Sequence, residues 1–63
     1  MVKRVRIGGS IRWKGGFIYV SKALVGELIG LKQVDETLWE IYYSSVFLGI
    51  LDESLGRIIP VKV

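Results

Sequence analysis

The stretch IRWKGGFIYV, residues 11–20, decides the fold, because two short alternating runs flank a pair of glycines. Glycine adopts positive φ without steric conflict, so Gly15-Gly16 predicts a two-residue β-hairpin turn that sets Lys14 opposite Phe17. Side chains alternate between the two faces of a strand. One face of this hairpin is then apolar throughout and belongs in a core: Ile11, Trp13, Ile18 and Val20. The other face mixes cations with aromatic rings: Arg12, Lys14, Phe17 and Tyr19.

Short runs of the same kind recur along the chain, and no run keeps an apolar 3.6-residue period long enough for a helix. The pattern predicts strands at residues 3–7, 10–14, 17–20, 28–34, 38–43, 46–51 and 57–61. Pro60 cannot donate to a ladder, so the last strand should lie at an edge or end there. Ser21 and Gly26 favour a single helical turn between them. We therefore expect one all-β domain over residues 1–63, a small SH3-like barrel of five to seven short antiparallel strands with at most one helical turn.

The first connection is predicted to be a three-residue loop at residues 8–10, because a two-residue loop would mix the faces. Such a loop aligns Val5 and Ile7 with the apolar face of the next strand. It also places like charges opposite one another on the outside, in the pairs Arg6 with Arg12 and Arg4 with Lys14. Like charges in direct opposition are destabilising. Phosphate groups of a bound partner would neutralise this repulsion, so the face suits a partner that carries phosphates.

A second hairpin is predicted around Ser44-Ser45. Its register assigns six residues to the core: Trp39, Ile41, Tyr43, Val46, Leu48 and Ile50. The opposite face carries an apolar set that is too large to leave in water without a reason: Leu38, Tyr42, Phe47 and Leu51. Two explanations remain open. Either the barrel curls and buries part of this face, or the set is an interface for another subunit or domain.

Composition and charge narrow the classes of function. The 63 residues are 51% hydrophobic and contain neither cysteine nor histidine, which excludes disulfides and thiolate metal sites and favours a cytoplasmic location. The most apolar run, residues 46–51, is too short to span a membrane, and no secretory signal opens the chain. Residues 1–26 contain six Lys and Arg and no acid, whereas residues 27–63 contain three against six acids. This segregation suggests a polyanionic partner such as nucleic acid.

The residue types favour binding over catalysis. General acid–base chemistry at neutral pH usually uses a histidine or a carboxylate with a raised pKa. The paired acids Asp35-Glu36 and Asp52-Glu53 are better explained as turn formers, and the scattered glycines form no phosphate loop. We expect no metal, no cofactor and no small-molecule substrate. The expected phosphate contacts are Arg4, Arg6, Arg12 and Lys14, with Phe17 and Tyr19 packing on sugar or base.

The run IRWKGGFIYVSKALVGELIGLKQVDETLWEIYYSSVFLGILD, residues 11–52, resembles a known family. It is similar to the C-terminal domain that follows the catalytic core in bacterial insertion-sequence transposases of the retroviral-integrase (DDE) superfamily. The matching positions are Ile11, Trp13, Gly15, Ile18, Tyr19, Val20, Ser21, Ala23, Leu24, Gly26, Glu27, Gly30, Leu31, Val34, Asp35, Trp39, Leu48, Gly49 and Asp52.

This resemblance implies an SH3-like barrel that binds the terminal DNA of the element and helps to assemble the transposase multimer. It implies no enzymatic activity for this chain, because the Asp, Asp and Glu triad of the family belongs to a separate upstream domain. Relatives often carry a basic residue where this chain has Gly16, which weakens the hairpin tip as a DNA contact. A protein-interaction or oligomerisation module remains the alternative. A signalling SH3 domain is disfavoured, because its peptide groove draws on an acidic loop and the early loops here are basic.

Overall fold

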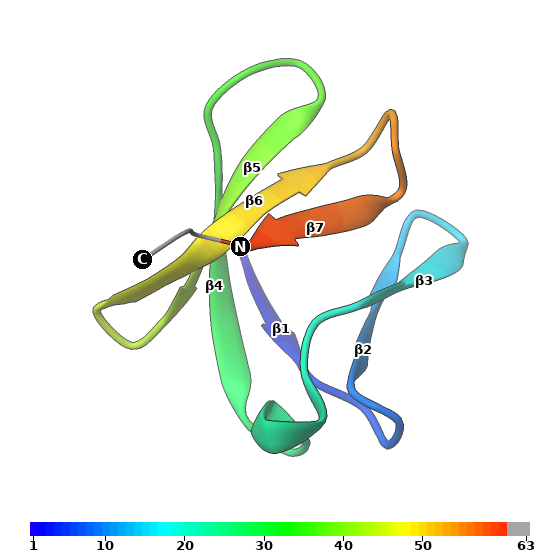
Figure 1. The fold of residues 1–63 in the computed structure, drawn as a ribbon, viewed down its shortest axis with the longest axis vertical. Helices are drawn as coiled ribbons and strands as arrows, with labels where there is room; N and C mark the ends of the chain where they lie inside the picture. The colour runs from blue at the N-terminus through cyan, green and yellow to red at the C-terminus, as the bar shows by residue number, and fades with distance from the viewer. Residues whose placement is uncertain (61–63) are drawn as a thin grey trace.

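The computed structural model describes residues 1–60, and these form an all-β barrel, as predicted (Figure 1). The strands are β1 (Val2–Arg4), β2 (Ser10–Trp13), β3 (Gly16–Tyr19), β4 (Leu28–Gln33), β5 (Leu38–Tyr43), β6 (Val46–Asp52) and β7 (Arg57–Pro60). The predicted helical turn is the 3-10 helix η1 (Lys22–Leu24), in which the Ser21 hydroxyl accepts a hydrogen bond from the Ala23 amide at 3.1 Å. Residue 61, the predicted end of the last strand, lies outside the described residues.

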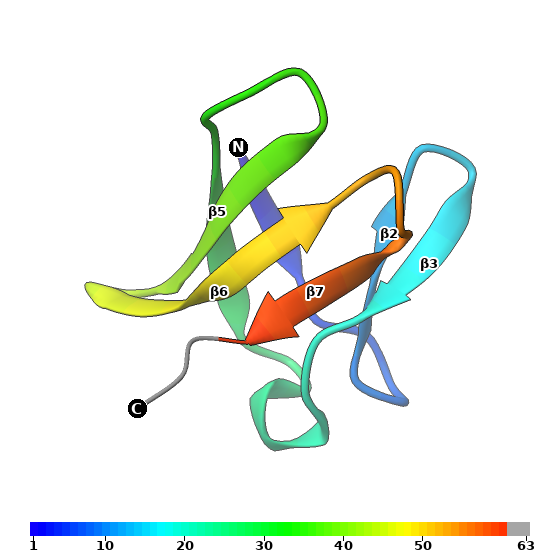
Figure 2. The ribbon, with the colours of Figure 1, turned by 45° about the horizontal axis from the view of Figure 1, so that its top comes forward.

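The strands form two antiparallel sheets. The larger has the order β1-β4-β5-β6-β7, and β7 lies at its edge, as Pro60 predicts. The smaller is the β2-β3 hairpin, which packs with β3 along β7 and with β2 along β1 (Figures 1 and 2). The hairpin therefore fills the gap between the two edge strands and completes the barrel.

The turn of the β2-β3 hairpin consists of Lys14 and Gly15, with φ of 46° and 86°, so the predicted Gly15-Gly16 turn is wrong. Ile11 pairs with Ile18, and Trp13 pairs with Gly16. Positive φ at both turn residues is what a type I′ hairpin turn needs, and here a glycine at the second position is enough to allow it. Because the turn lies one residue earlier than predicted, the cross-strand partner of each residue changes by two positions. An even change leaves every side chain on its predicted face.

The predicted pairing of the first strand is also wrong. β1 pairs with β4, and the Val5 amide donates to the carbonyl of Glu27 at 2.9 Å. The glycines at 8 and 9 both have positive φ and turn the chain away before it reaches β2. Val5 is buried as expected, but Ile7 is 96% exposed. The expected like-charge pairs, Arg6 on Arg12 and Arg4 on Lys14, are therefore not cross-strand pairs.

In the β5-β6 hairpin, Tyr43 pairs with Val46 across Ser44-Ser45 as predicted, but the register then shifts. Beyond this β-bulge, Trp39 lies opposite Leu51. Leu51 is fully buried, so its assignment to an outer interface is wrong. The predicted pairs of Ile41 with Leu48 and of Trp39 with Ile50 are wrong for the same reason. A β-bulge adds one residue to one strand. This one-residue shift in register moves every following side chain of that strand to the opposite face of the sheet.

Gly49 makes the bulge sterically feasible. It has φ of 152°, and a Cβ there would collide with the carbonyl oxygen of Ile59 on β7. Ile50 moves to the outer face, opposite Glu40, and Val46 is 55% exposed, so both predicted core positions are wrong. Leu48 still packs against the core. The absence of a side chain at Gly49 thus lets β7 approach β6 closely.

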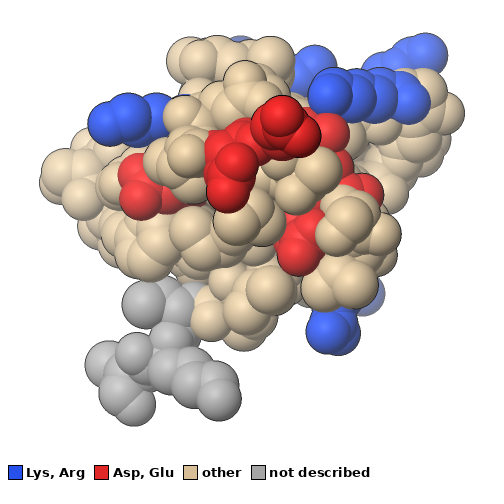
Figure 3. Space-filling model, turned by 90° about the horizontal axis from the view of Figure 1, so that it is seen from above, with Lys and Arg blue, Asp and Glu red and all other residues tan. Residues whose placement is uncertain are grey.

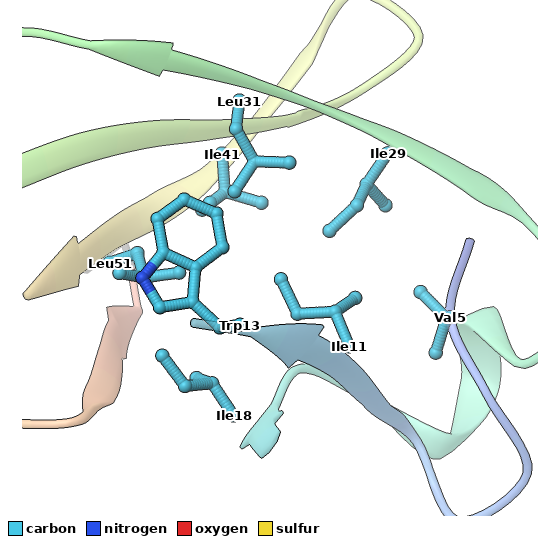
Figure 4. Close-up of a cluster of buried hydrophobic side chains, with 8 residues drawn as sticks. All are labelled: Val5, Ile11, Trp13, Ile18, Ile29, Leu31, Ile41 and Leu51. Atoms are coloured by element: carbon cyan, nitrogen blue, oxygen red, sulfur yellow. The ribbon is translucent and has the colours of Figure 1, made fainter. Parts of the chain in front are cut away.

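Eight buried side chains form the core, and they point toward one another from both sheets (Figure 4): Val5, Ile11, Trp13, Ile18, Ile29, Leu31, Ile41 and Leu51. The Trp13 indole is only 7% exposed. It meets the Trp39 ring edge to face, with centroids 4.9 Å apart and an interplanar angle of 83°. Such a pair adds to the stabilisation from burial. The prediction that Trp13 belongs to the core is confirmed, and Trp13 ties the hairpin to the larger sheet.

Candidate nucleic-acid interface

The outer face of the β2-β3 hairpin brings cations and aromatic rings together. Arg12 and Phe17 are cross-strand partners on this face, and Tyr19 lies two residues further along β3. The guanidinium carbon of Arg6 sits 5.2 Å from the centroid of the Phe17 ring, within the range of a cation–π contact. Phe17 is 60% exposed and Tyr19 57%. We call Arg6, Arg12, Phe17 and Tyr19 the hairpin cluster.

The turn at residues 6–9 brings Arg6 to this cluster. The Gly9 amide donates to the carbonyl of Arg6 at 2.9 Å, and the Arg6 amide donates to the carbonyl of Ser10 at 2.7 Å. Gly9 is buried, and its carbonyl accepts from the amides of Val20 and Ser21. A Cβ on Gly9 would lie 2.9 Å from Cε1 of Tyr19, so only glycine lets the turn pass beneath this ring. The turn is thereby fixed against β3.

Ile7 occupies the tip of this turn. Gly8 follows it with φ of 98°, which suits the third position of a type II turn. Burial of an isoleucine side chain stabilises a protein by about 1.5–3 kcal/mol, and this turn forgoes that gain. Sequence reasoning missed the position of Ile7, because alternation alone places it inward. The glycine pair that follows was the signal that the strand ends before it.

Lys14 stands apart from the cluster, at the hairpin tip. Its Nζ lies 3.0 Å from Oε2 of Glu53 and 5.9 Å from the centroid of the Trp13 ring. Trp39 Nε1 donates to the other carboxylate oxygen of Glu53. The hydrogen bond from Lys14 is the main cause that lowers the pKa of Glu53, with Trp39 adding to it. Glu53 was expected only as a turn former, and its role as the partner of the hairpin tip was missed.

Its neighbour Asp52 does form the turn, as predicted. The Asp52 carboxylate accepts from the hydroxyl of Ser54 at 2.6 Å and from the amides of Ser54 and Leu55. These bonds, led by the Ser54 hydroxyl, lower the pKa of Asp52. The β6-β7 turn is thus organised by its own acid, which holds Glu53 in reach of the hairpin.

Arg4 lies on the other sheet. From the edge strand β1 it pairs with Leu28 of β4, and its Nη1 donates to the carbonyl of Gly26 at 2.6 Å. The structure therefore brings Arg6, Arg12, Phe17 and Tyr19 together and separates Arg4 and Lys14 from them. Within the described part of the chain, Lys14–Glu53 is the one ion pair, so Arg6 and Arg12 face solvent without a carboxylate partner.

In the comparison with protein families, residues 1–57 match the family described as the IS481 family transposase, C-terminal domain. The chain belongs to this family. The match covers the hairpin cluster, Lys14 and Glu53, and it confirms the resemblance to a transposase C-terminal domain. Searches of curated proteins and of solved structures found no match.

The transposase domain has an uneven charge distribution. Figure 3 looks onto the end of the barrel that carries the β4-β5 and β6-β7 turns, where acidic side chains gather in the middle of the view and basic ones lie toward its margins. The acidic end includes Asp52 and Glu53, and the hairpin tip with Lys14 reaches it. Negative charge therefore gathers at this end of the barrel.

The outer face of the five-stranded sheet in this domain retains part of the predicted interface. Leu38, Tyr42 and Phe47 are half-buried, and the Tyr42 and Phe47 rings pack at 5.5 Å between centroids. Val2, Gly30, Tyr42 and Phe47 form one row across the sheet, in which Gly30 leaves a notch. The Tyr42 hydroxyl donates to Glu40 at 2.8 Å, which raises the pKa of this tyrosine. Leu51 is absent from this face for the reason given above.

Residues 1–60 contain no group of three or more Asp, Glu, His or Cys side chains able to hold a metal ion. Over the same range, no helix is long and apolar enough to cross a membrane.

Proposed function

We propose that residues 1–63 act as a single non-catalytic module that binds duplex DNA through the phosphate backbone. The observation that carries this proposal is the hairpin cluster, in which the Arg6 guanidinium lies on the exposed Phe17 ring and Arg12 is the cross-strand partner of Phe17. Guanidinium groups match phosphate oxygens, and exposed aromatic rings pack on sugars and bases. Membership of a transposase family agrees with a DNA partner of the transposon-end type.

Arg4 and Lys14 lie apart from the cluster, on β1 and at the hairpin tip, and add to the positive charge of the domain. The Arg4 guanidinium keeps its positive charge while it donates to the Gly26 carbonyl, because a carbonyl has no net charge to neutralise it. Lys14 is exposed but shares its charge with Glu53. We infer that Arg6 and Arg12 contribute most of the phosphate binding and that Arg4 and Lys14 contribute less.

A titration of duplex DNA at several salt concentrations tests the proposal. Each phosphate contact contributes a slope of about −0.9 in a plot of log K against log salt, so four contacts give about −3.6 and two give about −1.8. Arg6→Ala and Arg12→Ala should each make the slope shallower by about 0.9. Lys32→Ala is the matched control, because it removes the same charge from the exposed outer face of β4. A slope near zero, or an equal effect of Lys32→Ala, contradicts DNA binding by the cluster.

Self-association is a second candidate, favoured by the row of Val2, Tyr42 and Phe47 on the outer face of the larger sheet. The half-buried Leu38 belongs to the same face. A two-fold dimer would bury this face against its own copy. Sedimentation at micromolar concentration tests this directly. Dimerisation that Phe47→Ser abolishes supports the candidate, and a monomer at all concentrations removes it.

A further inference from the structure

Ile7 is the most exposed of the large hydrophobic side chains among residues 1–60, with 96% of its surface in water. It stands in a basic segment, directly after Arg6 and before two glycines. The backbone around Ile7 is ordered, because the amides of Gly9 and Arg6 donate hydrogen bonds that close the turn. The exposure of Ile7 is therefore a property of an ordered turn.

The same turn touches both aromatic rings of the hairpin cluster. The residue before Ile7 places its guanidinium on Phe17, and the residue two positions after it lies under Tyr19. Adjacent Cα atoms are about 3.8 Å apart, so Ile7 lies at the border of the surface proposed to meet DNA.

We propose that Ile7 enters the minor groove of duplex DNA bound at the hairpin cluster and wedges into a base step. This inference rests on the proposed DNA binding. An aliphatic side chain can form neither a hydrogen bond nor an ion pair with a phosphate. Minor-groove proteins, by contrast, insert apolar side chains as wedges between base steps and flank them with arginine. Gly8 has no heavy atom within 4 Å of its Cβ position, so the backbone beside the wedge is slim and can approach the groove walls.

A wedge has two consequences that phosphate contacts alone do not have. The DNA bends where the step is opened, and flexible pyrimidine–purine steps are easier to open than stiff A-tracts. The domain should therefore bind a duplex with a central TpA step more tightly than one with an A-tract of equal length. A surface contact between Ile7 and a protein would produce neither effect.

The test uses two end-labelled duplexes of equal length, one with a central TpA step and one with an A-tract. Energy transfer between the ends reports bending, and 2-aminopurine at the step reports unstacking. With the unaltered chain, we expect bending, unstacking and a preference for TpA. Ile7→Ser should abolish all three, weaken binding to the TpA duplex about tenfold and leave the salt slope unchanged, because no phosphate contact is lost. Ile7→Met, which keeps an apolar wedge, should retain the bend.

Leu55→Ser is the matched control, since Leu55 is an exposed leucine in the β6-β7 turn, at the acidic end. It should change neither bending nor affinity. If Arg12→Ala weakens binding while Ile7→Ser changes nothing, DNA binding stands and the wedge is wrong. Loss of affinity in Ile7→Ser without any unstacking by the unaltered chain also overturns the wedge. If the unaltered chain binds neither duplex, the proposed function itself fails.

Discussion

Lys14 Nζ lies 3.0 Å from Glu53 Oε2, and this ion pair joins the tip of the β2-β3 hairpin to the β6-β7 turn. The two turns belong to the two different sheets of the barrel. The Lys14 side chain remains 64% exposed, so water and salt screen the pair and its share of the stability is small. Its larger effect is to neutralise part of the positive charge of Lys14.

Removal of the Glu53 charge should strengthen DNA binding. In Glu53→Gln, Lys14 is no longer neutralised, so we expect a severalfold rise in affinity at low salt and a steeper salt slope. Glu36→Gln is the matched control, because Glu36 lies at the same end of the barrel and its side chain is not paired with Lys14. Equal effects of the two variants would show that only net charge matters and that the ion pair does not restrain Lys14.

Stability should fall in acid through Glu53. The pKa of Glu53 in the folded chain is below its ordinary value of 4.5, chiefly because Lys14 donates to it. The stabilisation is therefore present above pH 4.5 and is lost as the pH falls through the lower folded value. Urea unfolding between pH 6 and about pH 3 measures this effect. Glu53→Gln should show a shallower loss, and the remaining loss includes Asp52, whose pKa is lowered in the same direction. An unchanged pH profile in Glu53→Gln would contradict this assignment.

Truncation of the buried indole should be severe. Trp13→Ala removes the largest side chain that links the hairpin to the five-stranded sheet, and we expect a loss of about 3–5 kcal/mol in the free energy of unfolding. Val46→Ala is the informative control, since the alternation pattern assigns Val46 to the core but the structure exposes it. Its effect should stay within about 0.5 kcal/mol. A large effect of Val46→Ala would contradict the register of the β5-β6 hairpin. Chemical denaturation of the variants gives both values.

Alanine at the bulge should also be poorly tolerated. Gly49→Ala combines an unfavourable φ with a collision against the Ile59 carbonyl, so the loss should exceed about 1 kcal/mol. Gly30→Ala is the control within a strand, because its nearest contact would be 4.0 Å away, at the Tyr42 carbonyl. Thermal unfolding of both variants decides the question. Equal stability of the two variants would mean that the β-bulge in β6 does not require glycine at position 49.

Much of the fold could be predicted because alternation is robust to small errors. The hairpin turn was misplaced by one residue, yet Trp13 and Ile18 still face inward, since the pairing moved by an even number of residues. The bulge at Gly49 is an odd insertion, and it exchanged the faces of Ile50 and Leu51. A single sequence carries no signal that separates a bulge glycine from an ordinary strand glycine, because the collision that requires it comes from β7.

The candidate site was predicted in part. Arg12, Phe17 and Tyr19 share one face by alternation alone, which is a local property. Arg6 joins them by a different route from the expected cross-strand stacking, through the closed turn at residues 6–9. The pairing of β1 with β4 and the contact of Lys14 with Glu53 join residues far apart in the sequence, so no local pattern could indicate them.

The separation of the β2-β3 hairpin from the ladder of the larger sheet has a consequence for design. Its inward side chains, Ile11, Trp13 and Ile18, anchor it by packing, while its outward positions share no strand pairing with the rest of the barrel. The outward positions can therefore be exchanged as a set while the scaffold is kept. Grafting a different outer face onto the same three anchors would redirect the domain to a new ligand.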